Sequence, residues 1–289
     1  MMDIFGKVID DALIKDYTTY KLAGKINKVV YPKDIASLIE LIKYLKKENI
    51  KYMVIGNGSN LIFTKDYDGV IIKLDNFNEI EINDNIITVG AGYNLIKLAM
   101  KTAKLGLSGL EFASGIPATI GGAIYMNAGA YKREMADVVS EVLIIDDKLV
   151  LKKLMKKDLK FSYRSSIFKE KNYICISAIL KLSHGNKKEI LDVINKRKKR
   201  RLDTQPLDYP SAGSVFRNPL DDYAGRLIED AGLKGFSIGD AFVSKKHANF
   251  IINKGTAKGE DVKKLIMFVK KEIKEKYDIE LLVEQEIIE

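Results

Sequence analysis

The segment 115–131 (GIPATIGGAIYMNAGAY) constrains the fold of this chain most, because four of its residues are glycine. Glycine has no Cβ, so backbone amides in such a segment can approach a ligand closely. Thr119 and Asn127 add polar side chains. We interpret the segment as a cradle for a phosphate-bearing cofactor. The alternative is a loop whose glycines serve only the fold.

A second glycine loop, 56–61 (GNGSNL), follows the apolar run 52–55, which predicts a short buried strand. The glycine spacing is similar to the Rossmann dinucleotide fingerprint, but Leu61 occupies the place of the third glycine, and 62–63 continues as strand instead of opening a helix. The sequence therefore disfavours a Rossmann site. It favours a nest of amides that binds a pyrophosphate, with a tight turn between strands as the alternative.

Six segments, taken in order, resemble the bacterial UDP-N-acetylenolpyruvoylglucosamine reductases. They are the two glycine loops, 163–166 (YRSS), 212–219 (AGSVFRNP), 239–241 (GDA) and 281–284 (LLVE). The resemblance extends over nearly the whole chain. It implies a flavoenzyme that uses NADPH to reduce the enolpyruvyl ether of UDP-N-acetylglucosamine-enolpyruvate to UDP-N-acetylmuramate, a precursor of peptidoglycan.

The resemblance also implies the fold class, which is α+β. A two-part FAD-binding domain of the PCMH type, similar to that of vanillyl-alcohol oxidase, precedes a C-terminal α+β substrate-binding domain. We place the FAD-binding subdomains at 1–72 and 73–200 and the substrate-binding domain at 201–289. The chain after Arg164 passes directly into the apolar run 173–180 without an inserted loop, so it resembles the shorter, type II subclass.

The resemblance places non-covalent FAD on the two glycine loops. The predicted cofactor-binding residues are Gly56, Asn57, Gly58, Ser59, Asn60, Leu61, Gly115, Ile116, Pro117, Thr119, Gly121, Gly122, Asn127, Gly129 and Ala130. Covalent attachment of flavin is not expected, because His184, His247 and Cys175 lie outside these loops. Two histidines and one cysteine provide no metal-ligand cluster, so no metal is predicted.

Three catalytic residues follow from the resemblance. Ser214 matches the family's proton donor, Arg164 the arginine that holds the substrate carboxylate, and Glu284 the glutamate that works with that arginine. A turn serine and a surface salt bridge are the alternatives for Ser214 and Arg164. Strand alternation would put Glu284 and Glu286 on one face, so periodicity does not distinguish them. The register Leu281-x-x-Glu284 favours Glu284.

Arg217 and Asn218 suit contacts with a diphosphate or a sugar, and Arg201 is a further predicted substrate-binding residue. The chain departs from the family pattern at three positions. Arg217 replaces the common lysine, and Gln285 and Glu289 stand where valine and glycine are usual.

The net charge of +9 and the basic run 196–201 raise the possibility of nucleic-acid binding. Only seven of the 48 basic residues are arginine, the residue expected for bidentate phosphate and base contacts, so nucleic-acid binding is disfavoured. A basic enzyme would attract ligands that carry diphosphates. Two alternatives stay open: another flavoenzyme of this architecture, such as a carbohydrate oxidase, which would not need Ser214 and Glu284, and a nucleic-acid-binding module without flavin.

The chain has no apolar run long enough to span a membrane, and its start (MMDIFG) lacks a basic region followed by an apolar segment. We therefore expect a cytoplasmic enzyme with small-molecule partners only. Cys175, in the apolar run 173–180, is expected to be a small buried residue.

Apolar periodicity and turn residues predict the remaining elements. Helices are expected at 34–48, 94–106, 187–201 and 224–231, hairpins at 79–89 and 142–154, and a strand at 248–253. Thr256 is expected to cap a long amphipathic helix, after which the chain ends in a strand.

Overall fold

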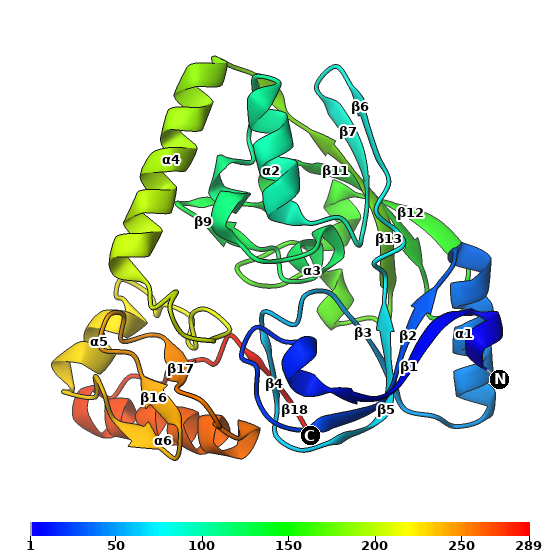
Figure 1. The fold of residues 1–289 in the computed structure, drawn as a ribbon. Coiled ribbons are helices and arrows are strands. Elements are labelled where there is room, and N and C mark those ends of the chain that lie inside the picture. Colours follow the sequence, from blue (N-terminus) through cyan, green and yellow to red (C-terminus); the bar gives the residue numbers. More distant parts are fainter. Residues whose placement is uncertain (1) are drawn as a thin grey trace. The chain divides into compact units, whose positions relative to one another are not determined.

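The computed structural model describes residues 2–289, and the chain divides into two compact units. Unit 1 comprises the N-terminal segment up to Ile9, Val29–Asn57 and Val70–Lys199. Unit 2 comprises Asp10–Lys28, Gly58–Gly69 and Arg200–Glu289. Figure 1 follows the chain through both units by colour, from blue to red. Helices and strands are mixed in each unit, so the fold class is α+β, as expected.

A four-stranded sheet near the N-terminus has the strand order β1-β2-β5-β3. Its strands are β1 (Gly6–Leu13), β2 (Lys25–Pro32), β3 (Tyr52–Ile55) and β5 (Tyr67–Lys73). β3 pairs with β5 in parallel. The connection between β2 and β3 is α1 (Ile35–Lys47), where Asp34 accepts a hydrogen bond from the Ser37 amide at 2.7 Å as N-cap. The expected helix at 34–48 is confirmed.

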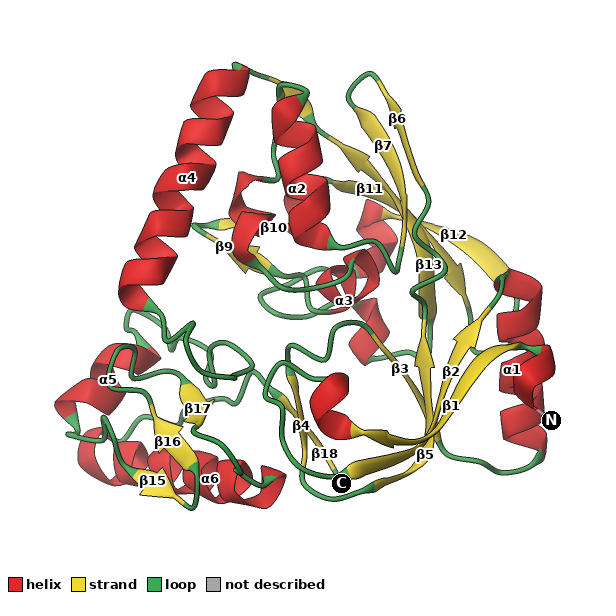
Figure 2. Cartoon of the chain, viewed as in Figure 1, coloured by secondary structure: helices red, strands yellow, loops and turns green. Residues whose placement is uncertain are grey.

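The main sheet of unit 1 has five antiparallel strands in the order β12-β11-β13-β7-β6. These are β6 (Ile80–Asn83), β7 (Ile86–Gly90), β11 (Val139–Ile145), β12 (Leu151–Met155) and β13 (Ile174–Lys181), which confirm both expected hairpins. α3 (Ile120–Tyr125) packs against β13 and β7 (Figure 2), and α2 (Leu95–Lys104) begins at its expected cap, Asn94. The buried side chains of these elements form one apolar core that includes Cys175.

The shorter elements of unit 1 connect the sheet and helices. They are η1 (Met2–Ile4), β8 (Leu107–Ser108), η3 (Glu111–Gly115), β9 (Gly129–Ala130), β10 (Arg133–Glu134), η4 (Met135–Asp137), η5 (Lys156–Leu159), η6 (Ile167–Lys169) and β14 (Ser183–His184). α4 (Lys187–Thr204) follows, and the division between the two units falls within it.

Unit 2 has its own apolar core, formed where the antiparallel sheet β15-β16-β17 lies against α6 (Figure 2). Its elements are η2 (Ile14–Asp16), β4 (Leu61–Phe63), α5 (Ala224–Asp230), β15 (Ser237–Ile238), β16 (Ala241–Val243), β17 (Ile251–Asn253), α6 (Gly259–Tyr277) and β18 (Glu286–Ile288). β18 pairs in parallel with β4, so the expected C-terminal strand is present.

The prediction that Thr256 caps the long helix was wrong. α6 begins at Gly259, and its N-cap is Lys258, whose amide donates to Asp261 at 3.1 Å. Thr256 does not cap the helix because its hydroxyl donates to Asp240 Oδ2 at 2.7 Å. The expected strand at 248–253 is shorter and covers only Ile251–Asn253.

Among residues 2–289, no helix combines the length and the apolar composition needed to cross a bilayer.

Candidate active site

The start of the first glycine loop, Gly56 and Asn57, lies against the second glycine loop within unit 1. Asn57 Nδ2 donates to the carbonyl of Pro117 at 3.1 Å, which joins residues that are 60 positions apart. A Cβ placed on Gly56 would lie 2.4 Å from Thr119 Oγ1, so only glycine permits this approach. The segments predicted separately to bind the cofactor therefore lie against each other.

A buried lysine holds the start of the first loop. The Lys73 side chain is 8% exposed, and its Nζ donates to the carbonyl of Gly56. The ammonium also pairs with Asp75 Oδ1 at 3.2 Å. Lys73 is also the β5 residue that pairs with Ile55, the last residue of β3. β5 therefore holds both the end of β3 and the start of the loop that follows it. A positive charge under this loop suits a diphosphate ligand.

Contacts within the protein require glycine at position 58, whether or not a ligand is bound. Its φ is +59°, and a Cβ there would lie 2.1 Å from the carbonyl oxygen of Tyr17. Within the part of the chain that the structure describes, the backbone amides of Asn57, Gly58 and Ser59 have no hydrogen-bond acceptor. Three consecutive donors of this kind suit phosphate oxygens, and they fit the expected pyrophosphate nest.

The second loop differs from the expected amide nest. The Gly121 amide donates to the carbonyl of Ala91 at 2.8 Å, and the Gly122 amide donates to Thr119 Oγ1 at 3.3 Å, where Thr119 is the N-cap of α3. These amides serve the fold. Space above Gly122 is nevertheless open, because the only atom within 4 Å of a Cβ built there is Thr119 Oγ1 at 3.4 Å. A side chain at Gly122 would fill a cradle that the protein leaves open.

Asn127 is fully buried and adopts a φ of +42°. Its Nδ2 donates to the carbonyl of Ser162 at 2.9 Å, and its Oδ1 accepts from the Ala136 amide at 2.9 Å. Arg164, two residues after Ser162, donates from Nη2 to the carbonyl of Gly129 at 2.8 Å. The second glycine loop thus holds the turn that carries the predicted catalytic arginine. The amide of Asn127 is used within the protein, and its role toward the cofactor stays a prediction.

The other predicted cofactor residues lie around these contacts. Gly115 ends η3, Ile116 and Pro117 continue toward α3, Gly129 and Ala130 form β9, and Ser59 and Asn60 precede β4, which begins at Leu61.

In unit 2, Ser214 lies on an extended segment that pairs with two other backbone segments. Ser214 forms an isolated antiparallel bridge with Phe250, and the Val215 amide donates to the carbonyl of Asn249 at 2.9 Å. The Asn249 side chain, 4% exposed, accepts from the Phe216 amide at 2.9 Å and donates to the Phe216 carbonyl at 2.8 Å. Sequence reasoning missed Asn249, since nothing in its local pattern distinguishes it from other polar residues.

On its other side, the same segment pairs with the chain that carries Glu284. The Glu284 amide donates to the carbonyl of Val215 at 2.8 Å, and Phe216 bridges Val283. Two residues predicted to act in catalysis therefore lie on directly paired backbone segments. Glu286 pairs elsewhere, because its amide donates to the carbonyl of Asn60 at 2.8 Å. This difference favours Glu284, although both side chains are partly buried.

The predicted substrate-binding residues also make contacts within unit 2. Arg201 Nε donates to Gln205 Oε1 at 2.9 Å, one turn later in α4. The Arg217 amide donates to the carbonyl of Leu282 at 2.9 Å. Asn218 Oδ1 accepts from the Ala224 amide at 3.2 Å, at the first residue of α5.

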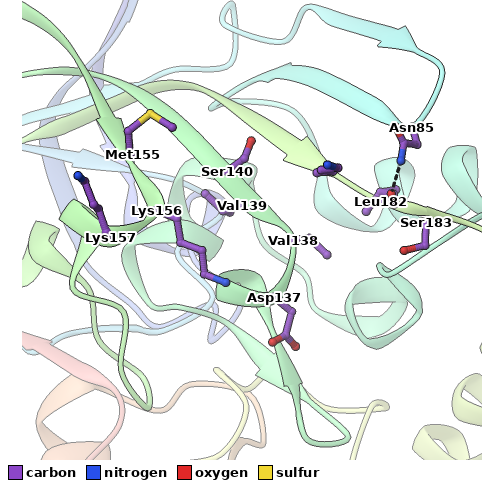
Figure 3. A pocket seen from close by; sticks show the side chains of 11 residues that line it. Asn85, Asp137, Val138, Val139, Ser140, Met155, Lys156, Lys157, Leu182 and Ser183 are labelled. Atoms are coloured by element: carbon purple, nitrogen blue, oxygen red, sulfur yellow. Dashed lines mark hydrogen bonds between the residues drawn. The ribbon is translucent and has the colours of Figure 1, made fainter.

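A cavity of about 550 Å³ in unit 1 contains none of the predicted site residues (Figure 3). It is lined by side chains that include Lys156, Lys157 and Lys181. Some of its polar side chains already have protein partners. For example, Asn85 Nδ2 donates to the carbonyl of Leu182 at 2.8 Å, drawn as a dashed line.

Comparison with known proteins gives a consistent result along the chain. A family model described as an FAD binding domain matches residues 26–148, and a model of the C-terminal domain of UDP-N-acetylenolpyruvoylglucosamine reductase matches residues 205–288. A UDP-N-acetylenolpyruvoylglucosamine reductase from Bacillus licheniformis is 45% identical over 98% of this chain and 94% of its own length. One from Caldicellulosiruptor bescii is 46% identical over 96% of this chain and 89% of its own length.

Among solved structures, the crystal structure of a UDP-N-acetylenolpyruvylglucosamine reductase from Thermus caldophilus superposes with a TM-score of 0.83. It is 34% identical in sequence, and the superposition covers 98% of each chain. The chain therefore belongs to the UDP-N-acetylenolpyruvoylglucosamine reductase family.

Proposed function

We propose that this chain is an FAD-dependent oxidoreductase that uses NADPH to reduce UDP-N-acetylglucosamine-enolpyruvate to UDP-N-acetylmuramate, in the synthesis of peptidoglycan precursors. The observation that carries the proposal is the direct backbone pairing between the segments of Ser214 and Glu284. A carbohydrate oxidase of the same FAD-binding architecture would not need this pair. Family membership and the joined glycine loops support the same reaction.

The residues of the two loops fit a flavin dinucleotide. The free amides of Asn57, Gly58 and Ser59 would bind the pyrophosphate, and the open space above Gly122 would admit the cofactor closely. The remaining predicted loop residues would complete a non-covalent site. Bound FAD supplies hydride transfer from NADPH to the substrate alkene.

The protein must supply a proton and stabilise charge. Hydride addition at one alkene carbon leaves enolate-like charge on the other carbon and its carboxylate. We assign proton donation to the Ser214 hydroxyl, which is a weak acid when free and must therefore be held close to the carbon that it protonates. The fixed guanidinium of Arg164 would hold the carboxylate, and Glu284 would assist at the same intermediate.

We assign the sugar-nucleotide diphosphate to Arg217, Asn218 and Arg201. Dinucleotide-binding signals occur only in the two loops described, so we propose that NADPH and the sugar nucleotide use one site in turn. Steady-state rates should then give parallel double-reciprocal lines. A demonstrated complex of the enzyme with both ligands would contradict shared use of one site.

We also propose that the chain has three domains, with boundaries at residues 72/73 and 200/201. We propose that the protein is located in the cytoplasm.

Absorption spectroscopy tests the function first. Purified protein should show the visible spectrum of oxidised flavin and release FAD on denaturation. NADPH should bleach that spectrum, and the enolpyruvyl sugar nucleotide should restore it without oxygen. Protein that stays colourless after incubation with FAD would overturn the proposal.

A further inference from the structure

A buried glutamine links the two segments assigned to proton transfer. The Gln285 side chain is 4% exposed and follows Glu284 directly in the chain. Its Nε2 lies 3.1 Å from the carbonyl oxygen of Ala212, 3.2 Å from that of Gly213 and 3.4 Å from that of Ser214. A primary amide has two N–H donors, so three acceptors at these distances share them.

The other end of the same amide is also held. Gln285 Oε1 accepts a hydrogen bond from the Tyr20 hydroxyl at 3.2 Å, and Tyr20 is fully buried. Burial raises the pKa of Tyr20, so this hydroxyl stays a donor at any pH at which the enzyme would work. The Tyr20 backbone is fixed in turn, because Asn253 Nδ2 donates to its carbonyl at 3.1 Å. The amide group of Gln285 thus has a defined orientation.

The Ser214 segment bends at Gly213, where φ is +76°, a conformation that favours glycine. The backbone of the segment is held by the bridge between Ser214 and Phe250. Gln285 adds side-chain hydrogen bonds to three consecutive carbonyls, those of Ala212, Gly213 and Ser214. A side chain without an amide at position 285 would make none of these hydrogen bonds.

We propose that Gln285, oriented by Tyr20, is a positioning residue that fixes the Ser214 turn relative to the strand of Glu284. The inference rests on the proposed function, since it assumes that Ser214 donates the proton. It follows that loss of the amide displaces the Ser214 hydroxyl, which slows proton delivery and leaves flavin reduction by NADPH intact.

The test separates the two half-reactions by rapid mixing. Gln285→Met keeps the approximate side-chain volume and removes every hydrogen bond of the amide. The variant should retain FAD and be reduced by NADPH within about twofold of the unsubstituted rate. Reoxidation by the enolpyruvyl sugar nucleotide should slow by about ten- to a hundredfold, the scale of a misplaced catalytic group.

Tyr20→Phe provides a milder second variant, because it removes only the hydroxyl that orients Gln285. It should slow reoxidation by about three- to tenfold, and adding it to Gln285→Met should slow the reaction no further, as expected for two residues that act through one network. If Gln285→Met does not fold, Tyr20→Phe decides the matter alone. Reoxidation at the unsubstituted rate in the Tyr20 variant would then reject the proposal.

Ile266→Val is the matched control, because Ile266 is fully buried in the core of unit 2 and has no part in this network. It should leave both half-reactions unchanged. Equal slowing of both half-reactions in Gln285→Met, or equal slowing of reoxidation in Ile266→Val, would overturn the positioning role. Failure of the unsubstituted enzyme to be reoxidised by the sugar nucleotide would instead overturn the proposed function.

Discussion

The predicted cofactor residues of unit 1 and the predicted proton-transfer residues of unit 2 are held in different ways. In unit 1, Asn57 binds the carbonyl of Pro117 and Lys73 binds the carbonyl of Gly56, so the start of the first glycine loop is held against the second loop and against β5. In unit 2, Ser214 lies on a segment that is held by backbone pairing with Phe250 and by a buried amide side chain, that of Gln285.

This difference indicates where substitutions should act. Changes in the two glycine loops should alter the retention of FAD. Changes around Ser214 should leave FAD bound and slow the reaction with the sugar nucleotide.

Ser214→Ala should slow reoxidation of the reduced enzyme by the enolpyruvyl sugar nucleotide by at least about a hundredfold, the scale of losing a general acid. Flavin reduction by NADPH needs no acid at this position and should stay near normal. Rapid-mixing absorbance at the flavin band measures both rates. Equal slowing of both steps would point to a damaged fold, and unimpaired reoxidation would remove Ser214 from the mechanism.

Glu284→Gln and Glu286→Gln form a matched pair for the same assay. Glu284→Gln should slow reoxidation, because the Glu284 backbone pairs with the Ser214 segment. Glu286→Gln should have little effect, because the Glu286 amide pairs with Asn60 before β4. The reverse outcome would show that Glu286 is the residue that matches the family glutamate.

Elements with local signals were predictable from the sequence. Asp34 and Asn94 cap their helices through hydrogen bonds to residues three positions later, and such contacts lie within one sequence window. Thr256 failed as a cap because Asp240, sixteen residues earlier, accepts its hydroxyl. The assignment of Asp10–Lys28 to unit 2 likewise depends on long-range packing that no local pattern reports.

The same contrast applies to the site. The loops and Ser214 could be proposed because motifs mark them, whereas Gln285 could be recognised only as a departure from the family pattern. Its three carbonyl partners are 71 to 73 residues away, and its hydroxyl partner is 265 residues away. Buried polar residues of this kind acquire their role from tertiary contacts.

Gly122→Val should weaken FAD binding by about tenfold or more, because the added side chain fills the open cradle that we assign to the cofactor. The apo-protein should melt near its usual temperature, since the protein leaves room at Gly122. Flavin fluorescence titration and thermal unfolding measure the two quantities. FAD affinity equal to that of the unsubstituted chain would exclude this part of the second loop from the site.

Gly58→Val is the contrasting variant. Its Cβ would lie 2.1 Å from the Tyr17 carbonyl oxygen, and valine tolerates a φ of +59° poorly. It should therefore destabilise the protein whether or not FAD is present. An apo-protein of normal stability would contradict the close approach seen at Gly58.

Lys73→Met should weaken FAD binding by about fivefold, which corresponds to about 1 kcal/mol for one hydrogen bond that holds the loop. Methionine preserves most of the buried stem and removes the ammonium that binds the Gly56 carbonyl. Asp75→Asn is the control, because it removes the ion pair and leaves the Lys73–Gly56 hydrogen bond. Equal losses of affinity in both variants would attribute the effect to the Lys73–Asp75 ion pair instead of the Lys73–Gly56 hydrogen bond.

The smallest effect is expected at Cys175, which lies in the core of unit 1 and is none of the predicted site residues. Burial raises the pKa of its thiol to about 12, so the folded protein favours the neutral thiol. This preference for the neutral thiol contributes to the stability of the folded protein. The contribution is complete below the pKa of the unfolded thiol, about 8.5, and is lost as pH rises through the folded pKa near 12. At pH 8 the thiol is neutral in the folded protein and belongs to neither site. Cys175→Ala should change FAD affinity and the reoxidation rate by less than about twofold, the scale of a substitution outside either site.

The thiol also provides a probe of the proposed division between the units. Only the thiolate reacts with disulfide reagents, so labelling of Cys175 at pH 8 should require opening of the unit 1 core. Binding of FAD to the two glycine loops should stabilise that core, and labelling should slow in proportion to the fraction of protein that is loaded. Ser214→Ala, which keeps FAD bound, should label as slowly as the unsubstituted enzyme, whereas Gly122→Val should label faster at the same FAD concentration. Rapid labelling of all three proteins at one rate would show that Cys175 is accessible without opening, which would contradict its burial in the core.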